Sequence, residues 1–196
     1  NGNYWIGMYN GGIALIKKEP LGFTVYKKDY DNQNSLSYGQ VTSITTDKDN
    51  NIWFATDGGG VSLYNRKTNE YTHYIHDSAK KNTISDNATV NIYYSKNQDI
   101  WVGTYIGGLS KIDKNKKFTN YKYSNTSNTI PGNFVKCITE DHLGNLWLGT
   151  DGSGLSYFDP RTEIFKNYSA RNYDGLVFDN ITYIYLQKDK YLWIGT

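Results

Sequence analysis

The stretch NIWFATDGGGVSLY, at residues 51–64, carries the pattern that decides the fold. A short apolar run ends in a Gly-rich turn, and a second short apolar run follows at once. The phrase returns as DIWVGTYIGGLSKI at 99–112 and NLWLGTDGSGLSYF at 145–158, and parts of it stand at 3–16 and 191–196. Its tryptophans, separated by 46 or 48 residues, are Trp5, Trp53, Trp101, Trp147 and Trp193. A fixed period of this length indicates a repeat architecture.

Each repeat contains four short runs that are rich in β-branched and aromatic residues. In the second copy these runs are 40–46, 51–56, 60–64 and 70–75, and turn sequences rich in Asp, Asn and Gly separate them. No stretch has a helical period of useful length. Four antiparallel strands in about 47 residues form one blade of a β-propeller, so the sequence predicts an all-β propeller.

The whole chain, residues 1–196, is expected to be a single propeller segment. The repeats are predicted at 1–39 (partial), 40–87, 88–133, 134–178 and 179–196 (partial). Because the chain starts and ends at the second strand of a repeat, the pattern gives 17 strands, one more than four closed blades need. We therefore expect an excerpt of a larger propeller of about seven blades. A closed four-blade ring and a dimer of two arcs are the alternatives.

Composition limits the classes of partner. The 196 residues are 38% hydrophobic and 20% charged, and the net charge of +2 is too small for a nucleic-acid binder. No apolar run approaches the roughly 20 residues that span a bilayer, so membrane attachment is expected only through missing parts of a longer parent protein. The single cysteine, Cys137, stands in the apolar stretch FVKCI and is predicted to be buried rather than reactive.

The repeated tryptophans are predicted to form the structural core of the repeat. Alternation along a strand places the Gly of the W-x-G-T phrase on the same side as the Trp, two residues on. A large ring beside a glycine fits packing between adjacent blades. The Gly pairs that follow are expected to adopt positive φ in tight turns.

Binding residues are expected on one face of the propeller. The connections between repeats, at 27–38, 76–87, 124–132 and 169–178, are long and variable, and they share that face with the turns between second and third strands. The candidate ligand-binding residues there are Tyr9, Asp57, Tyr105, Asp151 and Tyr38, with Tyr30, Asn34 and Tyr173 as weaker candidates. Aromatic rings beside Asn or Asp suit carbohydrate. Turn packing is the alternative role for each of them.

No catalytic residue, metal site or cofactor is expected, and the chain is not expected to be an enzyme. Asp57 and Asp151 occupy equivalent turns, which Asp favours for local reasons, and a glycosidase needs two carboxylates at a defined separation. The string beginning at Asp47 lacks the Glu that closes a calcium loop. On a continuous strand His73 and His76 point to opposite faces, and no third ligand of a zinc site is near.

Two copies carry a family resemblance. VKCITEDHLGNLWLGTDGSGLSYFDPRT (135–162) and VTSITTDKDNNIWFATDGGGVSLYNRKT (41–68) resemble the two-component regulator propeller repeat, whereas the copy at 88–114 departs from it in two turns. The resemblance implies the extracytoplasmic sensor region, in the periplasm or at the cell surface, of bacterial hybrid two-component histidine kinases and related receptors. Many such receptors respond to oligosaccharides. Any kinase activity would belong to the parent protein.

The sequence thus predicts a ligand-sensing propeller segment of a two-component receptor, with an oligosaccharide as the expected ligand and self-association through blades as the expected contact. A purely structural or dimerisation module is one alternative. A catalytic propeller, either a polysaccharide lyase or a glycosidase, is the other. It predicts a cluster of His, Asp, Glu or Arg converging on the propeller axis, which the repeats lack.

Overall fold

The apolar runs of the repeats form strands, and the part of the chain that the computed structural model describes contains no helix. The described residues are 4–8, 12–16, 23–188 and 190–196. The strands are β1 (Tyr4–Met8), β2 (Gly12–Ile16), β3 (Phe23–Tyr26), β4 (Val41–Thr46), β5 (Ile52–Thr56), β6 (Gly60–Asn65), β7 (Glu70–Tyr74), β8 (Thr89–Tyr94), β9 (Ile100–Thr104), β10 (Leu109–Ile112), β11 (Phe118–Tyr121), β12 (Val135–Glu140), β13 (Leu146–Thr150), β14 (Leu155–Asp159), β15 (Ile164–Tyr168), β16 (Tyr183–Gln187) and β17 (Tyr191–Gly195). The predicted all-β class is confirmed.

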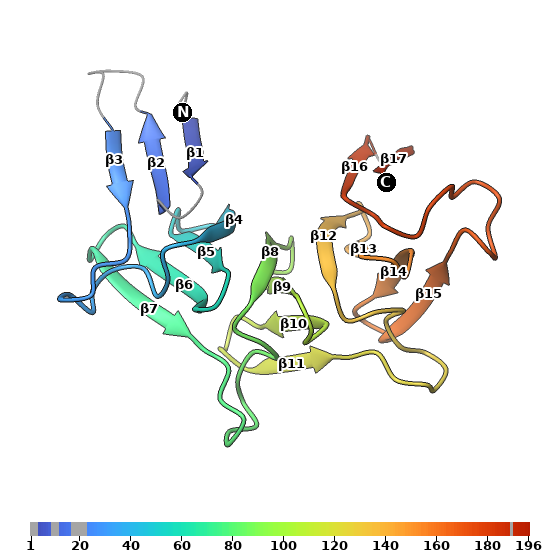
Figure 1. Cartoon of the computed structure of the whole chain (residues 1–196), viewed down its shortest axis with the longest axis horizontal. Coiled ribbons are helices and arrows are strands. Elements are labelled where there is room, and N and C mark those ends of the chain that lie inside the picture. The colour runs from blue at the N-terminus through green and yellow to red at the C-terminus, as the bar shows by residue number, and fades with distance from the viewer. Residues whose placement is uncertain (1–3, 9–11, 17–22, 189) are drawn as a thin grey trace.

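The strands pair with their sequence neighbours in five antiparallel sheets. Three sheets have four strands, in the orders β4-β5-β6-β7, β11-β10-β9-β8 and β12-β13-β14-β15; β1-β2-β3 precede them and β16-β17 follow them. These are the full and partial blades that the repeats predict. Figure 1 shows the sheets following one another along an open arc, with β4, β8 and β12 on its inner side. The first and last sheets stand apart at its two ends (Figure 1).

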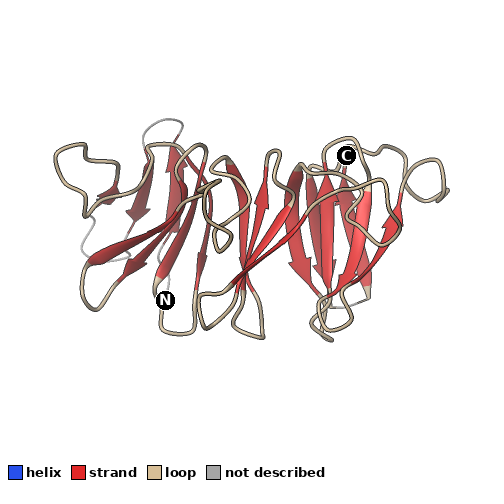
Figure 2. Ribbon diagram, turned by 90° about the horizontal axis from the view of Figure 1, so that it is seen from below, coloured by secondary structure: helices blue, strands red, loops and turns tan. Residues whose placement is uncertain are grey.

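The strands run between two faces of the arc, each of which carries loops (Figure 2). The turns between second and third strands share a face with the connections between sheets. The N–H of Gly60 donates to the carbonyl of Asn87 at 2.8 Å, and the N–H of Gly108 donates to that of Asn133 at 2.9 Å. We call this the crossover face. The opposite side, with the remaining turns, is the hairpin face.

Tryptophans of the repeat lie between neighbouring sheets. Trp53 packs in one cluster with residues of β8–β10, and Trp101 packs in another with residues of β12–β14. Trp147 is half-buried against the residues of β16 and β17. Trp193 does not occupy the predicted core position: its side chain is 60% exposed, because no further sheet of this chain covers β17. The side chain of Trp5 lies outside the described residues.

The glycine of the W-x-G-T phrase admits the next sheet. A Cβ on Gly103 would collide with the backbone carbonyl of Val135, and one on Gly149 would collide with the side chains of Cys137 and Ile181. The missing side chain therefore lets β12 approach Gly103, and it lets Cys137 of the same sheet and Ile181 of the connection before β16 approach Gly149. This is a more specific reason than room for the Trp ring alone.

Cys137 is the subject of a chemical prediction. Its side chain is buried and forms no disulfide, and burial raises the pKa of its thiol to about 11. Because the thiolate is the reactive species, we expect iodoacetamide to alkylate the native protein at pH 8 about 100-fold more slowly than the urea-unfolded chain. Mass spectrometry at timed intervals measures both rates. Equal rates in the two states would show that the thiol is accessible.

Candidate ligand-binding site

The predicted residues Asp57, Tyr105 and Asp151 occupy the same position in successive sheets, directly after the second strand. Each donates its backbone N–H to the residue that precedes the first strand of its own sheet: Asp57 to the carbonyl of Gln40 at 3.0 Å, Tyr105 to that of Ala88 at 2.9 Å, and Asp151 to that of Phe134 at 3.0 Å. The three residues therefore stand in the turns of the crossover face. Tyr9 lies outside the described residues.

Tyr38 covers the turn that follows β5. Side chains added at Gly58 and Gly59 would both meet Tyr38, which shows that its side chain lies against this glycine turn. Gly58 has a φ of +117°, so the turn requires glycine for its backbone as well. The geometry thus gives Tyr38 a packing role in its own sheet.

Tyr105 forms an aromatic pair with Phe134. The ring centroids are 4.5 Å apart, with an angle of 53° between the ring planes. Tyr105 is 54% exposed, whereas Phe134 is half-buried. The next residue, Ile106, donates its N–H to the carboxylate of Asp86 at 3.1 Å, which fixes the turn that carries the tyrosine. A solvent-facing aromatic surface is therefore held in place on the crossover face.

Lys136 links this aromatic pair to Asp151. It stands where the pairing of β12 with β13 shifts by one residue, between Val135 and Cys137. Its Nζ lies 5.6 Å from the centroid of the Phe134 ring, 3.4 Å from Oδ1 of Asp151 and 3.2 Å from Oδ1 of Asn180. The side chains of the ion pair are 25% and 35% exposed, so solvent screens their attraction and the pair adds little to stability.

We call Tyr105, Phe134, Lys136, Asp151 and Asn180 the aromatic–lysine cluster. The structure brings together two predicted residues, Tyr105 and Asp151, through three that the sequence reasoning missed. A comparison of the repeats could have found Phe134 and Lys136, because other repeats hold different residues at the equivalent positions. The positions equivalent to Phe134 hold Gln40, Ala88 and Asn180, and those equivalent to Lys136 hold Thr42, Val90 and Thr182.

The weaker candidates lie elsewhere and have local roles. Asn34 ties its loop to the outer strand of the next sheet, because its Oδ1 accepts the N–H of Tyr71 at 2.8 Å. Tyr173 packs edge-on against Tyr168 at 5.5 Å. Tyr30 is 89% exposed, with the ammonium of Lys28 at 5.8 Å from its ring. None of these contacts involves the aromatic–lysine cluster.

The histidines form separate hydrogen bonds. Nδ1 of His73 lies 3.0 Å from the hydroxyl of Ser62, and burial lowers the pKa of His73. Nδ1 of His76 lies 2.7 Å from the carbonyl of Ile84. Among the described residues no group of three His, Cys, Asp or Glu side chains is placed to hold a metal ion. The same part of the chain contains no helix long and apolar enough to cross a membrane.

Solved structures similar to this chain include sensor domains. The extracellular domain of the hybrid two component system BT3049 from B. thetaiotaomicron is 28% identical, with a TM-score of 0.79, over 98% of this chain and 24% of that chain. The extracellular domain of BT4673 from the same organism is 25% identical, with a TM-score of 0.78, over 99% of this chain and 27% of that chain. The chain thus spans about a quarter of the length of these domains.

A more distant structure shares the fold alone. Virginiamycin B lyase from Staphylococcus aureus is 18% identical, with a TM-score of 0.74, over 98% of this chain and 59% of that chain. No curated protein matches the sequence. The sequence profile of the family described as photosynthesis system II assembly factor YCF48 matches residues 21–158. The chain therefore belongs to that family, and it is a β-propeller segment built from repeats of the two-component regulator propeller type.

Proposed function

We propose that this chain is a ligand-binding segment of an extracytoplasmic sensor in a bacterial two-component system. The likeness to two extracellular domains of such systems supports this role. The observation that carries it is the aromatic–lysine cluster, in which Tyr105 and Phe134 present a ring surface beside the ion pair of Lys136 and Asp151. Packing of the repeat does not require the residues of the aromatic–lysine cluster, because positions equivalent to Phe134 and Lys136 in other sheets hold different residues.

The chemistry of the cluster favours an oligosaccharide. Aromatic faces pack against the C–H groups of a sugar ring, and ammonium, carboxylate and amide groups bond its hydroxyls. Lys136, Asp151 and Asn180 supply these three groups within one network. The cluster contains one carboxylate, whereas glycosidases commonly use two. The proposed role is therefore binding, and any kinase activity would reside in other parts of the parent protein.

Signalling would follow from a difference in affinity. A ligand shifts a receptor between two states only to the extent that it binds one of them more tightly. The cluster joins the turn after β9, the start of β12 and the connection before β16, so its residues come from three successive sheets. Ligand bound there would favour one arrangement of these sheets.

Binding is tested by a thermal-shift screen of defined oligosaccharides, followed by calorimetry on those that stabilise the protein. We expect Tyr105→Ala to weaken the affinity of such a ligand by about 30-fold, because an exposed aromatic anchor contributes about 2 kcal/mol. Tyr30→Ala is the matched control, since this tyrosine is more exposed and lies outside the cluster. It should leave the affinity unchanged. Equal losses in both variants would contradict a site at Tyr105.

A second function, self-association with another copy of this chain, is favoured by exposed apolar side chains on the same face. Ile106, Val177 and Phe178 are each more than half exposed. Light scattering across a concentration series distinguishes a 22.4 kDa monomer from a dimer. If this face mediates self-association, Phe178→Asp removes the dimer, and Ile164→Asp, an exposed position on the outer strand β15, does not.

A further inference from the structure

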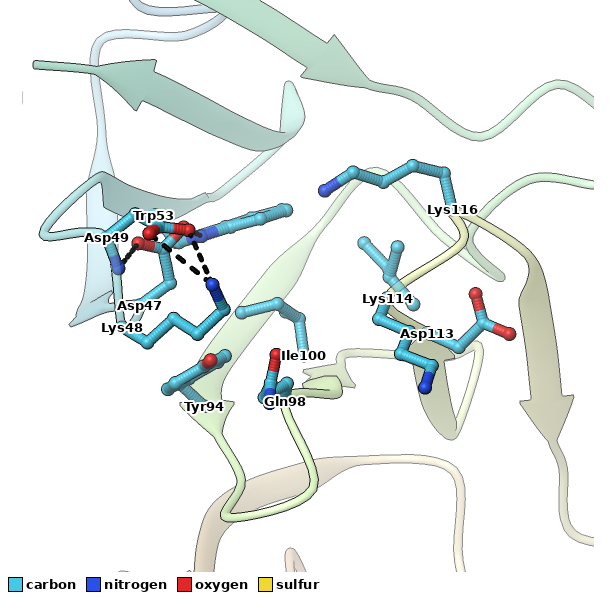
Figure 3. Close-up of a pocket in the computed structure, with 11 residues that line it drawn as sticks. Asp47, Lys48, Asp49, Trp53, Tyr94, Gln98, Ile100, Asp113, Lys114 and Lys116 are labelled. Carbon is cyan, nitrogen blue, oxygen red and sulfur yellow. Dashed lines mark hydrogen bonds and ion pairs between the residues drawn. The ribbon is translucent and has the colours of Figure 1, made fainter. Parts of the chain in front are cut away.

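The hairpin face carries a second site, remote from the aromatic–lysine cluster. A groove of about 260 Å³ lies between the sheet β4–β7 and the sheet β8–β11 (Figure 3). Its floor is formed by Trp53, Tyr94, Ile100 and Ile112. Its rim consists of three turns, which contribute Asp47, Lys48, Asp49, Gln98, Asp113, Lys114 and Lys116. The groove therefore combines an apolar floor with a charged rim.

The carboxylates of the rim are already occupied. Asp47 accepts the backbone N–H groups of Asp49 and Asn51, each at 3.0 Å, and the indole N–H of Trp53 at 3.1 Å. Asp49 is paired with Lys48 at 3.1 Å. Asp113 likewise accepts two backbone N–H groups of its own turn, at 2.8 and 2.9 Å. Asp47 and Asp113 therefore fix their own turns, and Asp49 is held by Lys48.

Unlike these carboxylates, the ammonium of Lys116 has a ring contact in place of hydrogen bonds. Its Nζ lies over the ring of Trp53, 4.7 Å from the centroid, and it points toward the groove in Figure 3. Within the described part of the chain the ammonium of Lys116 forms no hydrogen bond or ion pair, and it also lies 5.7 Å from the centroid of the Tyr74 ring. Partial burial lowers the pKa of Lys116, and the nearby carboxylates of Asp47 and Asp113 only partly oppose that shift. Among the described residues the ammonium of Lys114, the hydroxyl of Tyr94 and the side-chain amide of Gln98 also form no hydrogen bond or ion pair.

The boundary between the next two sheets has more hydrogen bonds between its charged groups and the chain. There Glu140 accepts the N–H of Lys96 at 3.0 Å, and Nζ of Lys96 donates to the carbonyl of Asp141 at 2.9 Å. The left-handed residue of the turn that corresponds to the Lys116 turn is Glu163, which accepts the hydroxyl of Tyr121 at 2.8 Å. Glu140, Lys96 and Glu163 are therefore held by hydrogen bonds within the chain. Lys111 lies over the ring of Trp101 at that boundary, at 5.6 Å from the centroid, whereas Lys116 approaches the ring of Trp53 to 4.7 Å.

We propose that this groove binds a small organic carboxylate with a compact apolar body. The anionic end would pair with Lys116, and Lys114, Tyr94 and Gln98 would supply further donors. The apolar body would lie against Tyr94 and the rest of the floor. Three lysines and three aspartates line the groove, so their formal charges cancel; the attraction comes from the ammonium groups that no carboxylate holds. This site is independent of the proposed sensor ligand.

Benzoate and its neutral isostere benzamide test this proposal on the ¹⁵N-labelled chain. We expect benzoate to shift the indole N–H signal of Trp53 and the amide signals of Gln98 and Lys116 saturably. Benzamide should bind at least about tenfold more weakly, because it lacks the charge that a lysine recognises. Equal shifts from both compounds, or shifts confined to other parts of the chain, would overturn the proposal.

Variants identify the lysine. Lys116→Gln should weaken the binding of benzoate by at least about tenfold, and Lys116→Arg, which keeps the charge, should retain most of the affinity. Lys116→Asn removes the charge but suits the positive φ, as Asn69 does at the left-handed position of the preceding sheet, so it guards against a misfolded turn. Lys117→Gln is the matched control, because it removes a neighbouring lysine that does not line the groove. Unchanged benzoate affinity in Lys116→Gln would overturn the assignment.

Discussion

Replacing Trp101 with alanine is expected to lower the free energy of unfolding by about 3–5 kcal/mol, the usual loss for a large buried aromatic residue. Trp101 is 1% exposed and packs between the third and fourth sheets. Its ring meets that of Phe158 edge-on at 5.8 Å and stacks on that of Tyr121 at 6.1 Å. Alanine would leave a cavity where one of the largest fully buried side chains packs between these two sheets.

Trp193→Ala is the matched control. It removes the same side chain from the same position of the repeat, but this ring is 60% exposed and makes one hydrogen bond, to Gln187 at 2.8 Å. We expect a loss of about 1 kcal/mol, since a single exposed hydrogen bond contributes about that much. Urea denaturation followed by circular dichroism measures both variants. Similar losses would contradict the assignment of Trp101, and not Trp193, to an interface between sheets.

Gly108→Ala is expected to destabilise the chain by about 2–5 kcal/mol, as the sum of backbone strain and overpacking. Gly108 has a φ of +80°, a region that L-residues avoid. A Cβ there would also collide with the backbone carbonyl of Tyr121, at the end of the outer strand β11. The carbonyl belongs to the paired backbone of the sheet, so it has little freedom to move.

Gly152→Ala separates the two contributions. Its φ is +77°, close to that of Gly108, but no atom lies within 4 Å of the added Cβ. Only the backbone term remains, so we expect a loss of about 1–2 kcal/mol. The same denaturation experiment compares the two alanine variants. If Gly152→Ala cost as much as Gly108→Ala, close packing at the start of β10 would have no measurable role.

The fold could be predicted because its signals are local and repeated. Alternating apolar residues, Asp- and Gly-rich turns and the recurring tryptophan specify each strand within one copy of about 47 residues, and every copy repeats the test. The exposure of Trp193 could not be predicted in the same way. The exposure of Trp193 depends on whether another sheet covers it, which is a property of the neighbour rather than of the phrase that contains it.

The candidate site was predicted only in part. Tyr105 and Asp151 could be identified because both follow the W-x-G-T phrase or its variant at the same position of the repeat. Asp151 repeats the Asp of the second copy, and Tyr105 replaces it. Phe134, Lys136 and Asn180 come from the beginnings of the following sheets, and their proximity arises from packing between sheets. The groove at Lys116 was missed for the same reason, since three turns from two sheets form its rim.

The central claim, that the crossover face at Tyr105 binds a sensor ligand, is tested most directly by an NMR titration. The ¹⁵N-labelled chain is titrated with an oligosaccharide that raises its melting temperature. We predict that the shifted amides lie at 105–107, 134–136, 151–153 and 180, all on the crossover face, and that the amides of the hairpin-face turns do not move. Shifts confined to the hairpin face, or spread evenly over both faces, would contradict the claim.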